Sequence, residues 1–455
     1  MRFVTEERRR FMNEKEELFR DAPIPRAVGK MALPCVISSL VLIIYNMADT
    51  FFVGQTKDAL QVAAVSLTNP VFVMFMAVAN LLGIGGSAMI SILMGKGEEK
   101  QAKAVSAFCC YASLGVGLVF AALIILFMEP LLHVLGSSQG TYTFARDYLF
   151  WIALGAPFIL FANTFGHVVR GEGAAAASMI GGMIGTVVNI VLDPLFILTF
   201  GMGTGGAAIA TVLGNVCGGI YYLWYFSRGK SVLSLHPGHL AGQRQLMVQT
   251  ALLGVPSGMN SALMSIANVL QNNVLAVYGD DQLAAMGIVT KIYMLIAFIH
   301  MGIANGIQPL LGYSYGSRRK ERFLGILKFS ALMTVVCGTV LTVGCIIWRH
   351  PILQVFIDDA SVVAYGEEML VATSLAGPVL GILFLCINSM QALDDPLPST
   401  ILSVCRQGLL FIPLLYLLDA LLGLTGVIYT QTAADYLSIV ISLFLLRRSM
   451  KKLRG

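Results

Sequence analysis

The sequence predicts an all-α polytopic membrane protein with twelve transmembrane helices in two pseudo-symmetric six-helix lobes. Three observations support this fold class: the composition, a succession of apolar runs of membrane-spanning length, and an internal repeat. Of the 455 residues, 57% are hydrophobic and 12% are charged, whereas soluble domains average roughly 45–50% and about 25%. The chain is therefore expected to lie in a lipid bilayer rather than in water.

Apolar runs of about 20 residues, the length that crosses a hydrocarbon core of ~30 Å, occur twelve times along the chain. In order, they lie near residues 31–53, 60–94, 104–128, 148–168, 176–200, 204–226, 246–278, 283–311, 323–348, 366–391, 399–418 and 424–446. The longest runs must include helix that extends beyond the bilayer.

Lysine and arginine gather in every second connection between these runs. The clusters are Arg8 to Lys30, Lys96 to Lys103, Arg170, Arg228 to Arg244, Arg318 to Lys328 and Arg447 to Arg454. The opposite connections hold Lys57, Arg146 and Arg349. Because basic residues collect on the cytoplasmic side, we expect both termini to be cytoplasmic in a bacterial-type cytoplasmic membrane. The formal net charge of +5 follows from these clusters, so no nucleic-acid partner is predicted.

The first 30 residues are polar and carry charges of both signs, without the apolar centre of a signal peptide. We expect residues 1–28 to form a cytoplasmic segment at the lipid surface, and the first apolar run to direct insertion. The eight cysteines lie singly or adjacently in apolar segments, without the spacing of metal ligands or of a disulfide framework. They are interpreted as packing residues.

Two halves of the chain resemble each other. QVAAVSLTNP with GIGGSAMISILMGKG aligns with QLAAMGIVTK and GIANGIQPLLGYSYGS. The aligned pairs are Gln61 and Gln282, Ala63 and Ala284, Gly85 and Gly306, Gly95 and Gly316, Pro34 and Pro256, Gly203 and Gly423, and Gly206 and Gly426. We predict lobes at 29–228 and 245–447, a linker at 229–244 and a basic tail at 448–455. Repeats of this kind place substrates near the membrane midplane in secondary transporters.

The sequence contains no motif that supports an enzymatic activity. GMGTGG at 201–206 has the spacing of a dinucleotide fingerprint, but it separates two membrane-length helices instead of following a strand. No phosphate-binding loop occurs, so neither ATP hydrolysis nor an ATPase subunit is implied. His133, His167 and His300 lie in different segments and form no ligand pair. We predict no enzyme activity, no prosthetic cofactor and no metal site beyond a possible Na⁺ site.

Charged residues inside apolar spans cost about 2.5–3.5 kcal/mol on insertion scales, so each one calls for a reason. Asp49 and Asp193 are the clear carboxylates, and Lys291 is the clear cation. Asn189 precedes Asp193 by four residues and therefore shares its helical face. Counting from the predicted outer ends of their spans places Asp49, Asp193 and Thr211 at similar depths. These four side chains are expected to form one oxygen-rich cluster.

Two carboxylates in a poorly hydrated site cannot both ionise at low cost, so the pKa of at least one should rise and make it a proton site. The same oxygens would suit a hard cation such as Na⁺. The alternative is that they merely join helices through hydrogen bonds. The second half offers Gln271, Asn272 and Asn273 opposite Asp49, and Ile412 opposite Asp193. Ion coupling is therefore predicted in the first half.

In the second half, Asn272 and Lys291 are assigned to the substrate cavity. For Lys291, snorkelling along a helix face is an equal alternative. Pro34 removes a backbone hydrogen bond from the first span and should kink it. A kink that changes with protonation of Asp49 and a static kink both fit the sequence.

Several segments in order then resemble a known family. They are Pro34 with YNMADTFFVG, AAVSLTNP, GIGGSAMISILMGKG, RGEG at 170–173, NIVLDPLFI at 189–197, GGAAIAT at 205–211 and QPLLGYSYGS at 308–317. Together they resemble the multidrug and toxic compound extrusion (MATE) transporters, of the DinF-like branch. The resemblance covers nearly the whole chain after about residue 22.

The resemblance implies a MATE-like fold with a central cleft, and export of amphipathic or cationic molecules in exchange for H⁺ or Na⁺. It implies a cation site in the first lobe, formed by Asp49, Asn189, Asp193, Thr211 and the carbonyl group of Ala207. By the same resemblance, Pro34 is a conformational residue, and Tyr45 and Asn163 line the first-lobe cavity.

We therefore expect a secondary multidrug antiporter that works by alternating access as a monomer, with the bilayer and small amphipathic substrates as its partners. The alternatives are a flippase for lipid-linked or polysaccharide intermediates, an exporter of an endogenous metabolite and an intramembrane enzyme. A flippase would need a strongly basic cleft, and an enzyme would need a catalytic constellation that the sequence does not contain.

Overall fold

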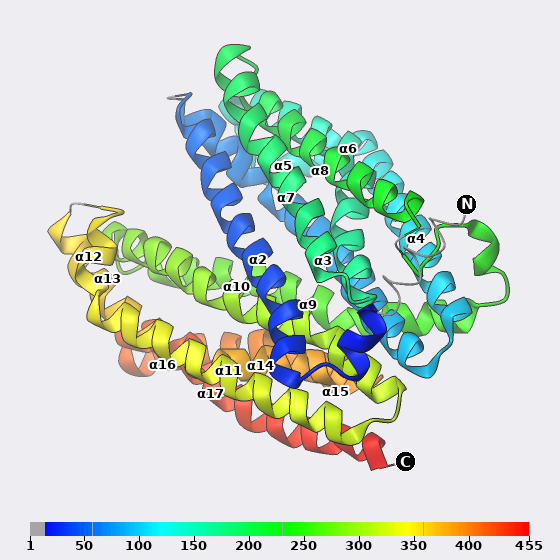
Figure 1. The fold of residues 1–455 in the computed structure, drawn as a ribbon. Coiled ribbons are helices and arrows are strands. Elements are labelled where there is room, and N and C mark those ends of the chain that lie inside the picture. The colour runs from blue at the N-terminus through cyan, green and yellow to red at the C-terminus, as the bar shows by residue number, and fades with distance from the viewer. Residues whose placement is uncertain (1–13, 57, 230, 358, 455) are drawn as a thin grey trace.

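The computed structural model describes residues 14–56, 58–229, 231–357 and 359–454, apart from the side chains of Asn46, Asp49, Thr50 and Arg454. The described chain is almost entirely helical, as the apolar runs predict (Figure 1). The helices of the first half are α2 (Ile24–Gly54), α3 (Ala59–Lys96), α4 (Glu99–Leu126), α5 (Met128–Val134), α6 (Gln139–Gly171), α7 (Ala175–Asp193), the π-helix η1 (Pro194–Thr199) and α8 (Gly203–Ser227).

A short 3₁₀-helix, η2 (Pro237–Leu240), lies in the connection between the halves. The second half contains α9 (Arg244–Leu275), α10 (Asp280–Gly316), α11 (Lys320–Ile347), α12 (Arg349–Gln354), α13 (Ala360–Ser374), α14 (Gly377–Ala392), α15 (Pro396–Val404), the π-helix η3 (Cys405–Leu410), α16 (Phe411–Leu422), α17 (Leu424–Ser449) and the 3₁₀-helix η4 (Met450–Arg454).

Ten helical spans among the described residues are long and apolar enough to cross a membrane, and the pair α13 and α14, bent by 44°, makes an eleventh. The twelfth predicted span corresponds to α9, which has 32 residues and therefore sufficient length. Asparagines and glutamines such as Asn260, Asn268 and Gln271 lower its hydropathy. The predicted order of spans thus matches the order of long helices.

The first helix of each half lies between the two lobes. α2 packs against α7 of its own half and α10 of the other, and α9 packs in the same way against α15 and α3. Figure 1 shows the two lobes splayed apart, with α12 at the tip of the second lobe. The first helix of each half thus makes equivalent contacts with both lobes, as a repeat about an axis along the membrane normal predicts.

The pattern of burial along α3 and α10 shows where the lobes meet. In the first part of α3 every third or fourth residue is buried, as in Ala64, Thr68, Val71 and Phe75, but all residues from 82 to 93 are buried. α10 repeats this pattern, and all residues from 302 to 314 are buried. The lobes therefore enclose the second halves of both helices and leave the first halves beside a cleft.

Glycines allow the lobes to approach closely at this closed end. A Cβ atom on Gly95 would lie 2.3 Å from the carbonyl oxygen of Tyr313, and one on Gly316 would lie 2.1 Å from that of Ile92. Both are repeat partners, so the pair lies where the two halves cross. Such approach is possible only without a side chain.

The helical residues 14–20 and the turn after them lie across the closed end and contact both lobes. We call residues 14–22 the N-terminal clasp. Phe19 is fully buried and stacks on Tyr313 of α10, with ring centroids 4.8 Å apart. Arg322 of α11 donates hydrogen bonds to the carbonyl oxygens of Leu18, Phe19 and Ala22 at 2.6–3.1 Å. Residues 1–13 of the predicted surface segment lie outside the described residues.

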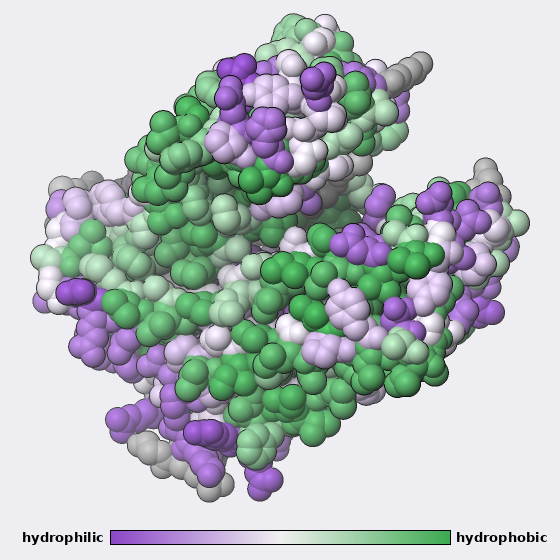
Figure 2. Space-filling view, turned by 180° about the vertical axis from the view of Figure 1, so that it is seen from behind, coloured by the Kyte–Doolittle hydropathy of each residue, from purple (hydrophilic) through white to green (hydrophobic). Residues whose placement is uncertain are grey.

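The surface is arranged for a bilayer. Broad hydrophobic areas cover the flanks of both lobes, hydrophilic residues collect toward the ends, and a hollow separates the lobes (Figure 2). Large apolar side chains are exposed on these flanks, including Leu332, Val336 and Val340 of α11. An exposed apolar surface of this extent indicates a lipid-facing belt rather than a water-facing surface.

Candidate cation-binding site

The predicted site is built where α7 and α8 approach each other through glycines. A Cβ atom on Gly214 of α8 would lie 2.5 Å from the carbonyl oxygen of Gly185 on α7, and 3.2 Å from the Cβ of Asn189. This close packing brings the polar side chains of the two helices into one layer. Side chains at i and i+4 share a helical face, so Asn189 and Asp193 both turn toward α8.

Asn189, Asp193 and Thr211 lie together, as the sequence predicts. The Asn189 amide donates to the Asp193 carboxylate at 3.4 Å and to the Thr211 hydroxyl at 3.3 Å. Their exposed fractions are 2%, 0% and 2%, which places a carboxylate in the dry interior of the lobe. The side-chain oxygen of Asn189 (Oδ1) is buried and has no hydrogen-bond partner among the described residues. It is an acceptor that a cation could use.

The first span reaches the same cluster. The Tyr45 hydroxyl of α2 lies 3.4 Å from the Thr211 hydroxyl, close enough for a hydrogen bond with either atom as the donor. Asp49 belongs to α2 one turn later, but its side chain lies outside the described part of the structure. Its predicted membership of the cluster therefore stays a prediction, supported by the position of Tyr45.

Asn163 joins this network through a residue that the sequence reading missed. The Asn163 amide of α6 donates to the Asn215 side-chain oxygen at 3.1 Å, and the Asn215 amide donates to the Thr211 carbonyl oxygen at 2.8 Å. Asn215 lies four residues after Thr211, the spacing by which Asn189 was connected to Asp193. The same periodicity could have identified it.

Backbone features complete the site. Ala207 is fully buried one turn before Thr211 on α8. α7 ends at Asp193, and the wider turns of η1 begin at Pro194, whose ring nitrogen cannot donate to the carbonyl group of Ile190. π-helical turns are rare and often occur at functional sites. Earlier in the chain, α2 continues through Pro34, which leaves the carbonyl group of Lys30 without its helical donor.

The predicted cavity residues of the second half, Asn272 and Lys291, lie on two different helices. Asn272 is exposed near the end of α9, and Lys291 is exposed on α10. Neither side chain has a described hydrogen bond or ion pair. Their assignment to a substrate cavity stays a prediction.

The second half contains two buried charged side chains that the sequence analysis did not single out. A buried ion pair joins Arg406 of η3 to Asp435 of α17, with Nε 2.7 Å from the carboxylate oxygen. Both residues lie within predicted spans, so Lys291 is not the clearest cation and the second half does hold a buried carboxylate. The signal was present in the sequence, because any charge within an apolar run requires compensation.

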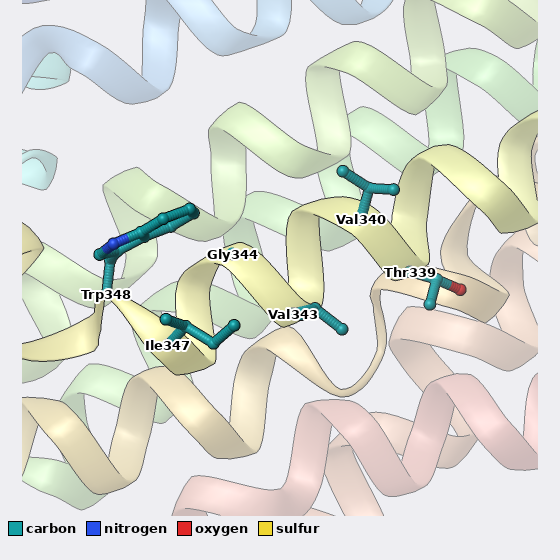
Figure 3. Close-up of a pocket in the computed structure, with 6 residues that line it drawn as sticks. All are labelled: Thr339, Val340, Val343, Gly344, Ile347 and Trp348. Atoms are coloured by element: carbon teal, nitrogen blue, oxygen red, sulfur yellow. The ribbon is translucent and has the colours of Figure 1, made fainter.

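Two surface pockets lie away from the predicted site residues. One, of about 310 Å³, lies along α11 and is lined by Thr339, Val340, Val343, Gly344, Ile347 and Trp348 (Figure 3). The other lies beside α5 and includes Glu129 and Arg146. The α11 groove is part of the lipid-facing belt, with Trp348 beside Arg349 in the position typical of a membrane interface.

Two pseudo-symmetric helical lobes, a cleft between them and a dry polar site within one lobe define a multi-pass membrane transporter. The MatE family model matches the chain twice, at residues 34–195 and 256–417, which repeats the internal duplication. The chain belongs to the MATE family, and it is a transporter rather than an enzyme.

Relatives and solved structures agree with this assignment. The chain is 31% identical to the multidrug export protein MepA of Staphylococcus haemolyticus (strain JCSC1435), over 94% of each chain. It is 30% identical to MepA of Staphylococcus aureus (strain NCTC 8325 / PS 47), over 93% of this chain and 94% of the relative.

Among solved structures, an outward-facing multidrug resistance MATE family transporter of the MOP superfamily gives a TM-score of 0.91 at 24% identity. A MOP superfamily transporter from Pyrococcus furiosus Vc1 (DSM3638) gives 0.90 at 23%. Each match covers 96% of this chain and 98% of the other. At these identities the likeness shows the fold, and the two-lobed architecture predicted from the repeat is confirmed.

Proposed function

We propose that this transporter exports amphipathic, often cationic molecules by antiport with H⁺ or Na⁺. The observation that carries the proposal is the fully buried carboxylate of Asp193, held by Asn189 within an otherwise apolar span. A neutral polar side chain is enough to join two helices, whereas a buried carboxylate supplies the negative charge that favours a proton or a hard cation. The name of the MepA relatives, multidrug export protein, supports the substrate class.

Coupling follows from the position of the site. With both termini in the cytoplasm, the cleft opens outward, and the closed end carries the N-terminal clasp. Entry of a cation to Asp193, Asn189 and Thr211 changes the charge of a buried site that contacts α2 through Tyr45. Because α2 also packs against α10 of the other lobe, it can link cation binding to the arrangement of the lobes.

The driving force is sufficient for useful export. One elementary charge that crosses 100 mV supplies about 2.3 kcal/mol. Since about 1.4 kcal/mol corresponds to a factor of ten, this sustains roughly a 50-fold substrate gradient if one charge moves per cycle. A bulkier substrate such as a lipid-linked oligosaccharide would need cationic groups in the cleft to bind its phosphates. Arg406 does not offer such a group, because it is already neutralised by Asp435.

Efflux of ethidium, an amphipathic cation, from cells that produce the protein tests the proposal. Asp193→Asn should reduce efflux to the level of cells without the transporter, because the site can no longer exchange a proton or bind Na⁺ strongly. Asp147→Asn, which alters an exposed carboxylate near the start of α6, is the matched control and should export normally. Full efflux by the Asp193 variant at normal expression would refute the proposed role of the site.

A further inference from the structure

The buried ion pair of the second lobe has an unusually complete set of partners. Asp435 accepts from Nε of Arg406 at 2.7 Å and from Nη2 at 3.5 Å. It also accepts from the Tyr293 hydroxyl at 3.2 Å and from the Gln431 amide at 3.1 Å. Nη2 of Arg406 lies 3.3 Å from the same Tyr293 oxygen. Residues from α10, η3 and α17 thus converge on one carboxylate.

This site excludes solvent. Arg406 is 2% exposed and Asp435 is 0% exposed. The guanidinium carbon lies 5.3 Å from the centroid of the Phe384 ring, within the range of a cation–π contact. Its Nη1 atom is buried without an acceptor among the described residues. The site therefore holds one positive charge, fixed by a carboxylate, an aromatic ring and a hydroxyl group.

The internal repeat relates this site to the cation site of the first lobe. The spacing that aligns Gly203 with Gly423 and Gly206 with Gly426 also places Gln431 opposite Thr211 and Asp435 opposite Asn215. Arg406 lies on the helical span Pro396–Leu422, the counterpart of the span Ala175–Thr199 that carries Asn189 and Asp193. Each span contains a π-helical turn, η1 at the end of the first span and η3 within the second, where the same spacing sets η3 opposite residues 185–190 of α7 and Arg406 opposite Thr186.

We propose that the second lobe contains the counterpart of the cation site, and that the guanidinium group of Arg406 occupies it as a tethered cation. In the first lobe, the helix pair α7 and α8 presents oxygen atoms to an exchangeable cation. In the second lobe, Asp435 of α17 and Tyr293 of α10 present oxygens to a cation that cannot leave, because it is the side chain of Arg406 on η3. One lobe responds to the ion gradient, and the other stays permanently loaded.

The role of this site in transport rests on the proposed function. That the guanidinium group of Arg406 occupies a cation site can be tested without any transport measurement. Removal of the Arg406 side chain leaves a carboxylate in a dry cavity shaped for a guanidinium group. Free guanidinium ion, which has the same planar donors, should then bind there. A ligand that binds the folded state stabilises it in a concentration-dependent way.

The experiment measures the melting temperature of purified Arg406→Ala protein in detergent against guanidinium concentration in the millimolar range. The variant is made in an Asp193→Asn background, so that the first-lobe site cannot contribute. We expect a lower melting temperature than in the parent and a saturable recovery with guanidinium. In the same background, Arg406→Ala combined with Asp435→Asn lacks the carboxylate and should show no such recovery. The Asp193→Asn parent protein, which keeps Arg406, should show none either.

A second comparison covers the case in which Arg406→Ala does not fold. Arg406→Lys keeps a cation and should yield folded protein that melts above Arg406→Met, which fills similar space without charge. Equal behaviour of Lys and Met, or a guanidinium response that persists without the Asp435 carboxylate, would overturn the tethered-cation site. Ethidium efflux by Asp193→Asn alone decides the proposed function, so the two failures are distinguishable.

Discussion

At the scale of single residues, Asp193 and its neighbours show how a membrane protein keeps a carboxylate in its interior. Asn189 donates to Asp193 and Thr211 with one amide group, and its side-chain oxygen is buried without a hydrogen-bond partner among the described residues. Burial of a charge is tolerated when hydrogen bonds and an opposite charge compensate it. In the proposed function, the exchangeable cation supplies that opposite charge when it binds.

The thermal stability of the protein should therefore depend on the coupling ion. We expect the melting temperature to rise with Na⁺ at alkaline pH, or with falling pH in the absence of Na⁺, because a ligand at 100 times its Kd adds about 2.7 kcal/mol. Asn189→Ala should move this dependence to higher ion concentration by removing one oxygen and the amide group that donates to Asp193 and Thr211. Differential scanning fluorimetry measures both curves.

The control for this prediction is Asn272→Ala, which changes an exposed amide of α9 that lies outside the site. It should leave the ion dependence unchanged. Identical ion dependence in the wild type and the Asn189 variant would show that the amide does not belong to the cation site.

At the scale of elements, the contact between α7 and α8 sets the geometry of the site. Gly185 and Gly214 allow the two backbones to touch, and this contact lies next to Asn189. A larger residue at Gly214 would have to displace the carbonyl group of Gly185, since a Cβ atom there would lie at 2.5 Å. Overpacking of this kind typically costs about 1–3 kcal/mol.

Gly214→Val should therefore separate α7 from α8, break the contact between Asn189 and Thr211 and abolish ion-dependent export while the protein still inserts into the membrane. Gly182→Val is the matched control on α7, because a Cβ atom at Gly182 meets nothing within 4 Å. Ethidium efflux and expression level should be measured for both. Normal efflux by Gly214→Val would show that the close approach of these helices is not required.

The sequence predicted these elements with different success. Apolar runs located the spans well, because length and hydropathy are properties of a local segment, and the run at 246–278 located α9 as well. Periodicity of four placed Asn189 with Asp193, and depth placed Thr211 beside them. Arg406 and Asp435 were missed, although each is a charge within an apolar run, and the packing of η3 against α17 shows that they form a pair.

At the scale of the whole molecule, the N-terminal clasp connects the lobes at the closed end. Lys15 is buried and forms an ion pair with Glu172, which follows α6, at 3.2 Å. The Glu172 carboxylate also accepts from the Tyr225 hydroxyl of α8, the Ser231 hydroxyl and the Val232 amide at 2.7–3.0 Å. Arg322 holds the other end of the clasp to the second lobe.

Glu172→Gln should weaken this closure, because it leaves the ammonium group of Lys15 buried without its carboxylate. Loss of one partner of a buried pair costs about 3–5 kcal/mol. Spin-label distances between Lys100 of α4 and Lys328 of α11, two exposed positions on the two lobes, should lengthen as the closed end opens. The double change Lys15→Met with Glu172→Gln removes both charges and should shift the distances less. Unchanged distances in Glu172→Gln would show that the clasp does not hold the lobes together.

The repeat also explains a limit of prediction at this scale. Sequence similarity between the halves predicted two lobes, and the crossing of Gly95 and Gly316 agrees with it. The clasp was not predicted, because its partners are separated by more than 150 residues and its charges resembled an ordinary solvated segment. Contacts of that range depend on the assembled fold rather than on any local pattern.

The most direct test of the central claim is transport by the purified protein in liposomes under imposed ion gradients. Vesicles loaded with ethidium are placed in a pH gradient, a Na⁺ gradient or neither, with wild type and Asp193→Asn compared at equal protein content. The account predicts that one of the two gradients drives ethidium movement against its concentration by the wild type, and that Asp193→Asn abolishes this movement. Gradient-independent transport, or equal uphill transport by the variant, would contradict it.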